Sequence, residues 1–257
     1  MTALLRAESV TIRLSHTDIV KGASFSLARG ELTALVGPNG AGKTTLMRAL
    51  AGLIAAQGHI EIEGRPLAEI PQRERARMMA YLPQGNIFHW PMPVDAIVGL
   101  GRYPHGDPFA APTDADKSAI RDALAATAMQ SFAHRAVTTL SGGERARVAL
   151  ARALATQAPI LLVDEPTVSL DIRHQLVVME LLRKAARNGG GVLAVIHDLS
   201  LAARFADRVL VMESGRITAQ GAPAETLDPA RIAEAFGVEA QMLPFDGAEI
   251  PVARRPL

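Results

Sequence analysis

Cysteine is absent from the 257-residue sequence. Disulfides, cysteine-ligated zinc and thiol catalysis are therefore excluded, and the composition is compatible with a reducing compartment. The sequence also lacks an uninterrupted apolar run of about 18 residues, the length that predicts a membrane-spanning helix. The apolar run at the start, MTALL, is too short for the core of a signal peptide. We therefore expect any membrane role to come through a partner.

An excess of charge of one sign is missing too. The net charge is +1, so no global field attracts nucleic acid or anionic lipid, and we expect no nucleic-acid partner. Hydrophobic residues make up 49% of the sequence and charged residues 21%, which is typical of a globular protein. A chain of this length forms one domain, or one core with an inserted subdomain.

Two kinds of predicted strand divide the sequence. Apolar residues occupy every second position in residues 10–14, 24–27 and 59–64, a pattern typical of antiparallel strands with one solvated face. A second set is apolar throughout, which favours a parallel sheet covered on both faces. Helical patterns at Thr44–Leu53 and His174–Gly191 alternate with this set and predict an α/β sheet. The members of the second set are Leu32–Val36, Ile160–Val163, Val192–Ile196 and Val209–Met212.

The middle of the sequence, from about residue 86 to residue 155, shows no buried-strand pattern. Residues 112–130 carry a capping residue, Thr113 or Asp114, followed by apolar residues at helical spacing. We expect a mostly helical insertion here. The tail has weak periodicity and two prolines in its last seven residues, so we expect it to be loosely ordered. The expected division of a single domain, residues 1–257, is a core at about 1–85 and 156–238, a helical insertion at about 86–155 and a tail at about 239–257.

The stretch GPNGAGKTT, residues 37–45, fits the P-loop pattern G-x-x-x-x-G-K-[ST]. It follows a predicted strand and opens a predicted helix, which is the context that the motif requires. The glycines allow backbone N–H groups to surround phosphates, while Lys43 is placed for the β- and γ-phosphates and the Thr44 hydroxyl for Mg²⁺. The residues predicted to bind nucleotide here are Gly37, Pro38, Asn39, Gly40, Ala41, Gly42, Lys43, Thr44 and Thr45.

Two carboxylates end the apolar strand ILLVDEP. Asp164 is placed to hold Mg²⁺, directly or through water, and Glu165 to position or activate water near the γ-phosphate. Gln84 and His197 also follow predicted core strands. Because ligands bind at the carboxyl ends of parallel strands, we expect these four side chains to share one site with the P-loop.

The stretch LSGGERARVALARALA predicts a capped helix. Ser141 is a good N-cap, and Glu144 stands three residues later, as in a capping box. Capping does not require the two following glycines, Gly142 and Gly143. They indicate close approach by something bulky, such as a phosphate, at the positive end of the helix.

Taken in order, these motifs resemble those of the ATPase subunit of ATP-binding cassette (ABC) transporters, over nearly the whole chain. The resemblance implies an α/β P-loop NTPase (RecA-like) core with a parallel sheet, an N-terminal antiparallel β region and an inserted helical subdomain. It also implies a head-to-tail dimer in which ATP lies between the P-loop of one copy and the helix that begins at LSGGE in the other. In this family the LSGGE stretch is called the signature. The motifs that carry it are GPNGAGKTT, Gln84, LSGGE, ILLVDEP, SLD at residues 169–171 and His197.

The resemblance also assigns roles. Ser141, Gly142 and Gly143 would serve the γ-phosphate bound by the second copy, and Asp171 would link the two sites. Thr44, Gln84 and Asp164 would serve Mg²⁺. Glu165 would be the general base, and His197 would hold the γ-phosphate and the attacking water.

Three positions depart from the pattern of the family. Leu14 stands where the family usually stacks an aromatic ring on adenine, and His16 is the nearest substitute. Val168 replaces a usual serine, and Ala146 replaces a common glutamine. Neither of these two replacements removes a phosphate or metal ligand, so we expect ATP hydrolysis to be retained.

The short length of the chain, and an ATPase domain with no fused membrane domain, resemble the ATPase subunits of bacterial importers. The segment VDAIVGLGRYPHGDP, residues 94–108, is similar to ATPases of iron–siderophore, haem and cobalamin importers. Trp90, Met92 and Pro93 just before it form an apolar patch that could bind a permease helix. The alternative is that Trp90 and Met92 fill the core of the insertion.

The expected function is therefore ATP hydrolysis that drives uptake of a metal chelate through a separate transmembrane permease. The expected cofactors are ATP and Mg²⁺, and the expected location is the cytoplasmic face of the inner membrane. An extracytoplasmic binding protein is an indirect partner. Two alternatives remain open: a soluble ABC ATPase, such as one serving iron–sulfur cluster assembly, and a simple P-loop kinase, although the kinase offers no role for LSGGE.

Overall fold

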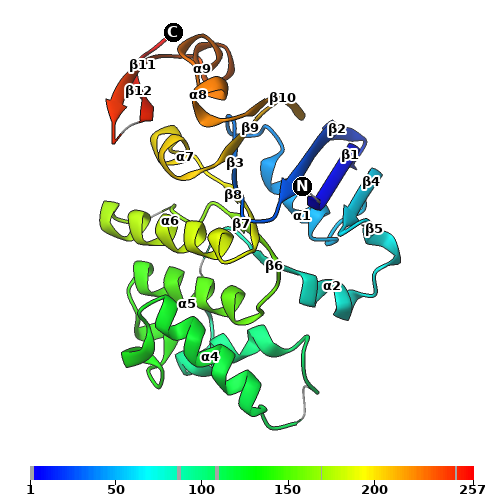
Figure 1. Ribbon diagram of the computed structural model, residues 1–257, viewed down its shortest axis with the longest axis vertical. Helices are drawn as coiled ribbons and strands as arrows, with labels where there is room; N and C mark the ends of the chain where they lie inside the picture. Colours follow the sequence, from blue (N-terminus) through cyan, green and yellow to red (C-terminus); the bar gives the residue numbers. More distant parts are fainter. Residues whose placement is uncertain (1–2, 86–87, 108–109, 169, 247) are drawn as a thin grey trace.

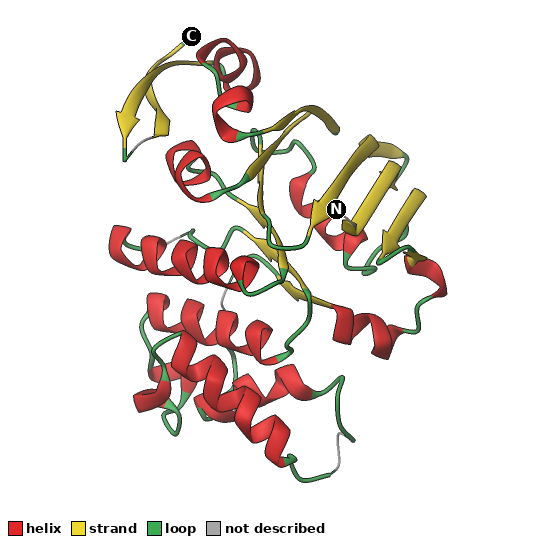
Figure 2. Cartoon of the chain, in the orientation of Figure 1, coloured by secondary structure: helices red, strands yellow, loops and turns green. Residues whose placement is uncertain are grey.

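A computed structural model describes residues 3–85, 88–107, 110–168, 170–246 and 248–257. Two sheets pack around one helix, and a layer of helices covers the other side of the larger sheet (Figures 1 and 2). Within the described residues, no helix is both long enough and apolar enough to cross a membrane.

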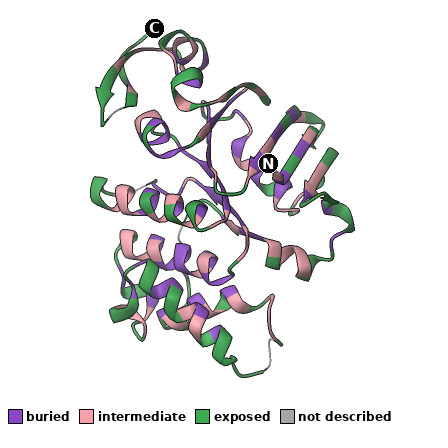
Figure 3. Cartoon of the chain, in the orientation of Figure 1, coloured by how far each residue is buried: buried purple, intermediate pink, exposed green. Residues whose placement is uncertain are grey.

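The larger sheet has the strand order β10-β9-β3-β8-β7-β6. Five strands run parallel, and β10 pairs antiparallel with β9 at one edge. All residues of β3, β7 and β8 are buried, as the continuous apolar runs predict (Figure 3). The strands are β3 (Leu32–Val36), β6 (Met79–Leu82), β7 (Ile160–Asp164), β8 (Gly191–Val195), β9 (Arg208–Glu213) and β10 (Arg216–Gly221).

The smaller sheet is antiparallel, with the order β2-β1-β4-β5, and confirms the expected N-terminal antiparallel region. Its alternating strands turn their apolar side chains toward α1, which is enclosed between the two sheets. Successive residues of the parallel strands face opposite cores: Leu35 packs toward α1, and Ala34 packs toward the helical layer. The elements are β1 (Ala3–Leu14), β2 (Thr17–Ala28), β4 (Gln57–Ile62), β5 (Arg65–Pro66) and α1 (Lys43–Leu50).

The described residues between β6 and β7 form helices, short 3₁₀ turns and loops, with no strand among them. The described residues there form a core of their own, in which Val98, Leu124 and Val148 come from three different helices. The start of α4 is settled by Thr113, whose side chain forms a capping box with Asp116. These helices are α3 (Val94–Gly99), α4 (Asp114–Ala126) and α5 (Gly142–Ala155), with short 3₁₀ turns at Leu100–Arg102, Gln130–Phe132 and Val137–Thr139.

The remaining helices lie before β6 and after β7. Both α6 and α7 pack against the face of the parallel sheet that is turned away from α1. The helices are α2 (Gln72–Met78), α6 (Ile172–Arg187), α7 (Leu199–Phe205), α8 (Pro223–Thr226) and α9 (Pro229–Phe236), with a 3₁₀ turn at Leu67–Glu69.

The expectation of a loosely ordered tail is wrong. The strands β11 (Val238–Phe245) and β12 (Ala248–Pro256) form an antiparallel hairpin. The hairpin is joined to α7, because the Ser200 hydroxyl donates to the carbonyl oxygen of Pro251 over 2.8 Å. The pairing of the two strands satisfies backbone groups that the weak apolar pattern does not reveal.

Candidate nucleotide site

The P-loop connects β3 to α1 and requires glycine at two positions. Gly37 has φ +152°, and a Cβ there would lie 2.0 Å from the carbonyl oxygen of Met212. Gly42 has φ +102°, and a Cβ there would lie 3.0 Å from the carbonyl oxygen of Ile19. Any larger residue would push the loop away from β2 and β9, so these glycines fix the path of the backbone.

The N-terminus of α1 has no side-chain cap, because the N-cap residue is Gly42. The first N–H groups of a helix have no acceptor within it, and its dipole favours an anion there. Asn39 and Gly40 are exposed at the tip of the loop, whereas Ala41 is buried. Uncapped amides beside an exposed loop form a cradle that fits phosphate.

Lys43 is 5% exposed, and its Nζ donates to the carbonyl oxygens of Gly37 at 2.7 Å and Pro38 at 2.9 Å. Burial lowers the pKa of Lys43, while the charges of Glu165 and Asp164 oppose this effect. The ammonium group is thus held under the loop, within the reach of two carboxylates. Thr44 and Thr45 are half-buried on the first turn of α1.

Asp164 ends β7 and is 1% exposed. The Thr44 hydroxyl donates to its Oδ1 over 3.2 Å, and the Tyr81 hydroxyl donates to its Oδ2 over 3.3 Å. Burial raises the pKa of Asp164, and the neighbouring charge of Glu165 adds to the rise. A carboxylate beside the Thr44 hydroxyl provides oxygens of the kind that Mg²⁺ prefers, so the residues present fit this ion.

Tyr81 was not predicted as a site residue. It lies on β6, paired in register with Leu162 of β7, and burial together with Asp164 raises the pKa of its hydroxyl. The only signal in the sequence is its place in the strand that precedes Gln84. That place does not say which face of the sheet the ring occupies.

Glu165 follows β7 with φ +53°, an uncommon backbone conformation for a residue other than glycine. Its Oε1 lies 2.6 Å from Nε2 of His197, and Gln84 donates its side-chain N–H to the other oxygen. Glu165 is 13% exposed at the side chain. The structure thus brings together Gln84, Glu165 and His197, which follow three neighbouring strands.

The signature stretch forms the start of α5 and confirms the predicted capping box. Glu144 donates its N–H to the Ser141 hydroxyl, and the Ser141 N–H donates to Oε2 of Glu144 over 2.7 Å. Ser141 and Gly142 are exposed, and a Cβ on Gly142 would meet nothing within 4 Å. The N-terminus of α5 therefore faces open space, in a different layer from α1 (Figure 1).

Asp171 lies beside this start of α5. It caps α6, and its Oδ1 lies 2.8 Å from Nδ1 of His174. A Cβ on Gly143 would lie 3.1 Å from the His174 ring, so the signature and the start of α6 are in contact. The small size of Gly143 allows this approach.

Leu14 and His16 lie at the tip of the β1–β2 hairpin. Leu14 is 43% exposed, and His16 has φ +73° in the turn that leads to Thr17. The same hairpin places Ile19 against Gly42 of the P-loop. The β1–β2 hairpin therefore lies next to the P-loop, and Leu14 presents an exposed apolar side chain at the tip of the hairpin.

The GRYPH segment is held against the rest of the chain by a network of polar contacts. Arg102 pairs with Asp116 at 2.8 Å and donates to the carbonyl oxygen of Ala155, with both charged side chains almost buried. His105 Nε2 lies 2.8 Å from the carbonyl oxygen of Thr156. Arg77 donates to the carbonyl oxygen of Pro104 over 2.7 Å. This segment therefore fastens the end of α5 to its surroundings.

The residues before GRYPH divide between core and surface. Met92 is half-buried and packs against the helical core, whereas Trp90 is 75% exposed. Of the two interpretations, filling of the core therefore holds for Met92 and not for Trp90.

The arrangement can bind and hydrolyse a nucleotide. It combines a positive cradle, an oxygen set that suits Mg²⁺, and a carboxylate that can activate water. Among the described residues, no group of three or more His, Asp or Glu side chains could hold a metal ion. An ion at Asp164 would therefore need phosphate oxygens or water to complete its coordination.

Comparison with known proteins agrees with this geometry. The family model for ABC transporters matches residues 20–168. A hemin import ATP-binding protein, HmuV of Streptomyces coelicolor, is 43% identical over 98% of this chain and 90% of its own length. A cobalamin import ATP-binding protein, BtuD of Halobacterium salinarum, is 42% identical over 90% of this chain and 58% of its own length.

A solved structure of an inward-facing ABC transporter, of a proposed metal-chelate type, contains a similar chain. The TM-score is 0.85 with 26% identity, over 100% of this chain and 98% of that chain. The chain therefore belongs to the ABC transporter family and is an ATP-hydrolysing member of it.

Proposed function

We propose that this chain is the ATPase subunit of an ABC importer that takes up a metal chelate, with haem as the favoured cargo. The observation that supports hydrolysis is the convergence of Glu165, His197 and Gln84 beside the P-loop. The cargo rests on the relatives: HmuV proteins of Streptomyces coelicolor, Rhodopseudomonas palustris and Pseudomonas aeruginosa are named for hemin import and are 40 to 44% identical.

The P-loop would hold the phosphates of ATP. The free N–H groups at the start of α1 would donate hydrogen bonds to the phosphate oxygens, and Lys43 would exchange its contacts with Gly37 and Pro38 for the β- and γ-phosphates. The buried position of Lys43 strengthens this contact, since a charge is less screened away from water.

Mg²⁺ would be held by Thr44, Asp164 and Gln84. When bound, the ion neutralises charge that develops on the phosphates. The chain provides the means of holding it: Tyr81 and Thr44 fix both oxygens of Asp164, and the raised pKa of this carboxyl reflects a buried negative charge that a cation would stabilise.

Glu165 would act as the general base. One of its oxygens lies against His197 and the other against Gln84, so the carboxylate is held rigidly at the end of β7. A carboxylate in this place can take a proton from water as it attacks the γ-phosphate, while His197 orients the water and the phosphate.

A second copy of the chain would complete each site. Ser141 and Gly142 are exposed, and α5, which begins with them, lies in another layer of the molecule from α1 and the P-loop. An anion bound there would therefore belong to a neighbouring copy. ATP would stabilise the closed dimer because it contacts both copies.

A permease would provide the attachment to the membrane at its cytoplasmic face. Trp90 supports this proposal, because a tryptophan that is 75% exposed next to the helical core is a good anchor for a partner helix. An extracytoplasmic binding protein would deliver the chelate to that permease.

Reconstitution tests the proposal. The chain is assembled with its permease in lipid, and ATP hydrolysis is measured with binding protein loaded with hemin, cobalamin or an iron–siderophore. We expect hemin-loaded protein to stimulate hydrolysis most. Stimulation by none of the three would contradict the importer, and recovery of a soluble cluster-assembly scaffold as the partner would favour the iron–sulfur alternative.

A further inference from the structure

A cleft lies between the C-terminal ends of α6 and α7 and the hairpin of β11 and β12. Its volume is about 640 Å³, within the usual range of small-molecule sites. Its lining shares no residue with the nucleotide site described above. Both helices nevertheless begin near that site, α6 after Asp171 and α7 after His197 and Asp198.

Four cationic side chains converge on this cleft: Arg183, Lys184, Arg187 and Arg204. Within the part of the chain that the structure describes, none of them forms an ion pair. Glu180 and Asp246 also line the cleft, but the cations outnumber them. The cleft therefore has an excess of positive charge.

Two of the arginines are partly held by their neighbours. The guanidinium of Arg204 lies 5.1 Å from the ring centre of Phe205 and 5.0 Å from that of Phe245. The Nε of Arg183 is buried and has no hydrogen-bond partner among the described residues. The Nε atoms of Arg147 and Arg231 are buried in the same way elsewhere, so a ligand is indicated by the four cations and by the position of Arg204.

The helix dipole explains only part of this cluster. Lys184 and Arg187 lie in the last turn of α6, where cations interact favourably with the helix C-terminus. That interaction does not account for the buried Nε of Arg183, or for Arg204, which comes from another helix.

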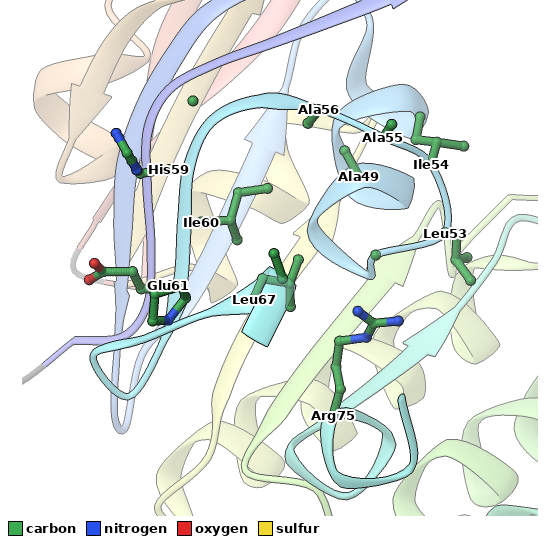
Figure 4. Close-up of a pocket in the computed structure, with 14 residues that line it drawn as sticks. Ala49, Leu53, Ile54, Ala55, Ala56, His59, Ile60, Glu61, Leu67 and Arg75 are labelled. Carbon is green, nitrogen blue, oxygen red and sulfur yellow. The ribbon is translucent and has the colours of Figure 1, made fainter. Parts of the chain in front are cut away.

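The cavity shown in Figure 4 offers a contrast. It has a volume of about 490 Å³ and lies between the end of α1, β4 and α2. Ile60 and Leu67 line it, and among the described residues of its lining Arg75 alone is an arginine or lysine. A cleft of similar size thus forms without a cluster of cations, so the cluster beside α6 is a specific feature.

We propose that the cleft between α6, α7 and the hairpin binds a flat aromatic ligand that carries two or more acidic groups. The acidic groups pair with Arg183, Arg187 and Arg204. The flat part lies along Phe245 and Ile250, which form the apolar side of the cleft. A porphyrin with carboxylates and a nucleotide with phosphates both have this chemistry.

The test uses the full chain with Lys43→Ala, which weakens nucleotide binding at the P-loop. Hemin and ADP are titrated in separate experiments, by absorbance and by calorimetry. We expect one of them to bind with one site per chain, and Arg204→Gln to weaken that binding at least about tenfold, the loss of a charge-assisted contact. Arg121→Gln removes the same charge from exposed α4 and is the matched control; it should bind as the parent does.

The identity of the bound probe distinguishes a carboxylate ligand from a phosphate ligand. Arg187→Gln, on the exposed end of α6, gives a second variant if Arg204→Gln does not fold. Binding of neither probe overturns the proposal, and so does equal binding by Arg204→Gln, Arg187→Gln and Arg121→Gln. Because the probes are added to the isolated chain, failure here leaves the permease reconstitution unaffected.

Discussion

The N-termini of α1 and α5 are both rich in glycine, yet they are built differently. The start of α1 has no side-chain cap and lies over a buried lysine, next to Asp164 and Glu165. The start of α5 is capped by Ser141 and is open to solvent. The first contains the chemistry of the site, and the second provides only amides and a hydroxyl. The difference supports the proposal that the second end acts on a nucleotide held by another copy.

Replacement of Glu165 by glutamine should have the largest effect. The amide keeps the size of the side chain but cannot accept a proton, so we expect ATP hydrolysis to fall by about 10²- to 10⁴-fold. ATP binding should persist, and dimers should accumulate with ATP bound, as size-exclusion chromatography would show. Hydrolysis near the wild-type rate would remove Glu165 from its proposed role.

A pair of glycine substitutions separates the two helix ends. Gly37→Ala forces a Cβ to within 2.0 Å of a carbonyl oxygen and should lower the free energy of unfolding by about 2 kcal/mol or more. Gly142→Ala meets nothing within 4 Å and should change that free energy by less than about 0.5 kcal/mol.

Hydrolysis should nevertheless fall in Gly142→Ala, because the methyl group stands where the neighbouring copy would bring its γ-phosphate. Denaturant unfolding and ATPase assays on both variants give the comparison. Full activity in a stable Gly142→Ala or Gly142→Val variant would mean that nothing approaches this surface closely.

Tyr81→Phe should affect only the P-loop end. It removes the hydroxyl that donates to Asp164, and groups that support a metal ligand typically contribute about tenfold or more to metal affinity. We expect hydrolysis to require about tenfold more Mg²⁺, with little change at saturating Mg²⁺. Phe25→Leu, at a buried position in the other sheet, is a control for general loosening of the core.

The two ends should also respond to pH with opposite sign. Burial raises the pKa of Asp164 above its value in the unfolded chain. Ionisation of this carboxyl therefore lowers the free energy of unfolding as the pH rises above the pKa of the unfolded state. The hydrogen bond from the Ser141 N–H lowers the pKa of Glu144, so its contribution is present above the unfolded value and is lost as pH falls.

Near pH 7 without Mg²⁺, Asp164→Asn should therefore raise the free energy of unfolding. Glu144→Gln should lower it by about 0.5 kcal/mol, the effect of a charge at a helix start. Both differences should shrink below about pH 4, near the ordinary pKa of these carboxyls. Thermal unfolding from pH 3 to 8 measures them, and shifts of the same sign would contradict the assigned environments.

The sequence predicts best what local patterns control. Continuous apolar runs predict the buried parallel strands, because both faces of each strand must be covered. The spacing of Ser141 and Glu144 predicts the cap of α5, since both partners lie within one turn. Glu165, Gln84 and His197 could be placed together because strand ends of a parallel sheet meet at one edge.

Contacts between distant segments escape such patterns. The β11–β12 hairpin has few buried residues, so its strands show little alternation of apolar and polar residues. Its link to α7 runs from the Ser200 hydroxyl to the backbone carbonyl oxygen of residue 251, an acceptor that any residue there would provide. The contact of Tyr81 with Asp164 depends on the pairing of β6 with β7, which the sequence does not reveal. The GRYPH segment shows the same limit, because the partners of Arg102 lie 14 and 53 residues away.

The most direct test of the two-copy site mixes two inactive variants. Lys43→Ala removes the P-loop lysine, and Ser141→Arg blocks the start of α5. Each homodimer should be inactive, whereas the heterodimer contains one site made of an intact P-loop and an intact signature. We expect ATP hydrolysis to return in the mixture, at up to about half the wild-type rate per dimer if the two sites act independently. A mixture that forms heterodimers but hydrolyses ATP no faster than either variant alone would contradict the two-copy site.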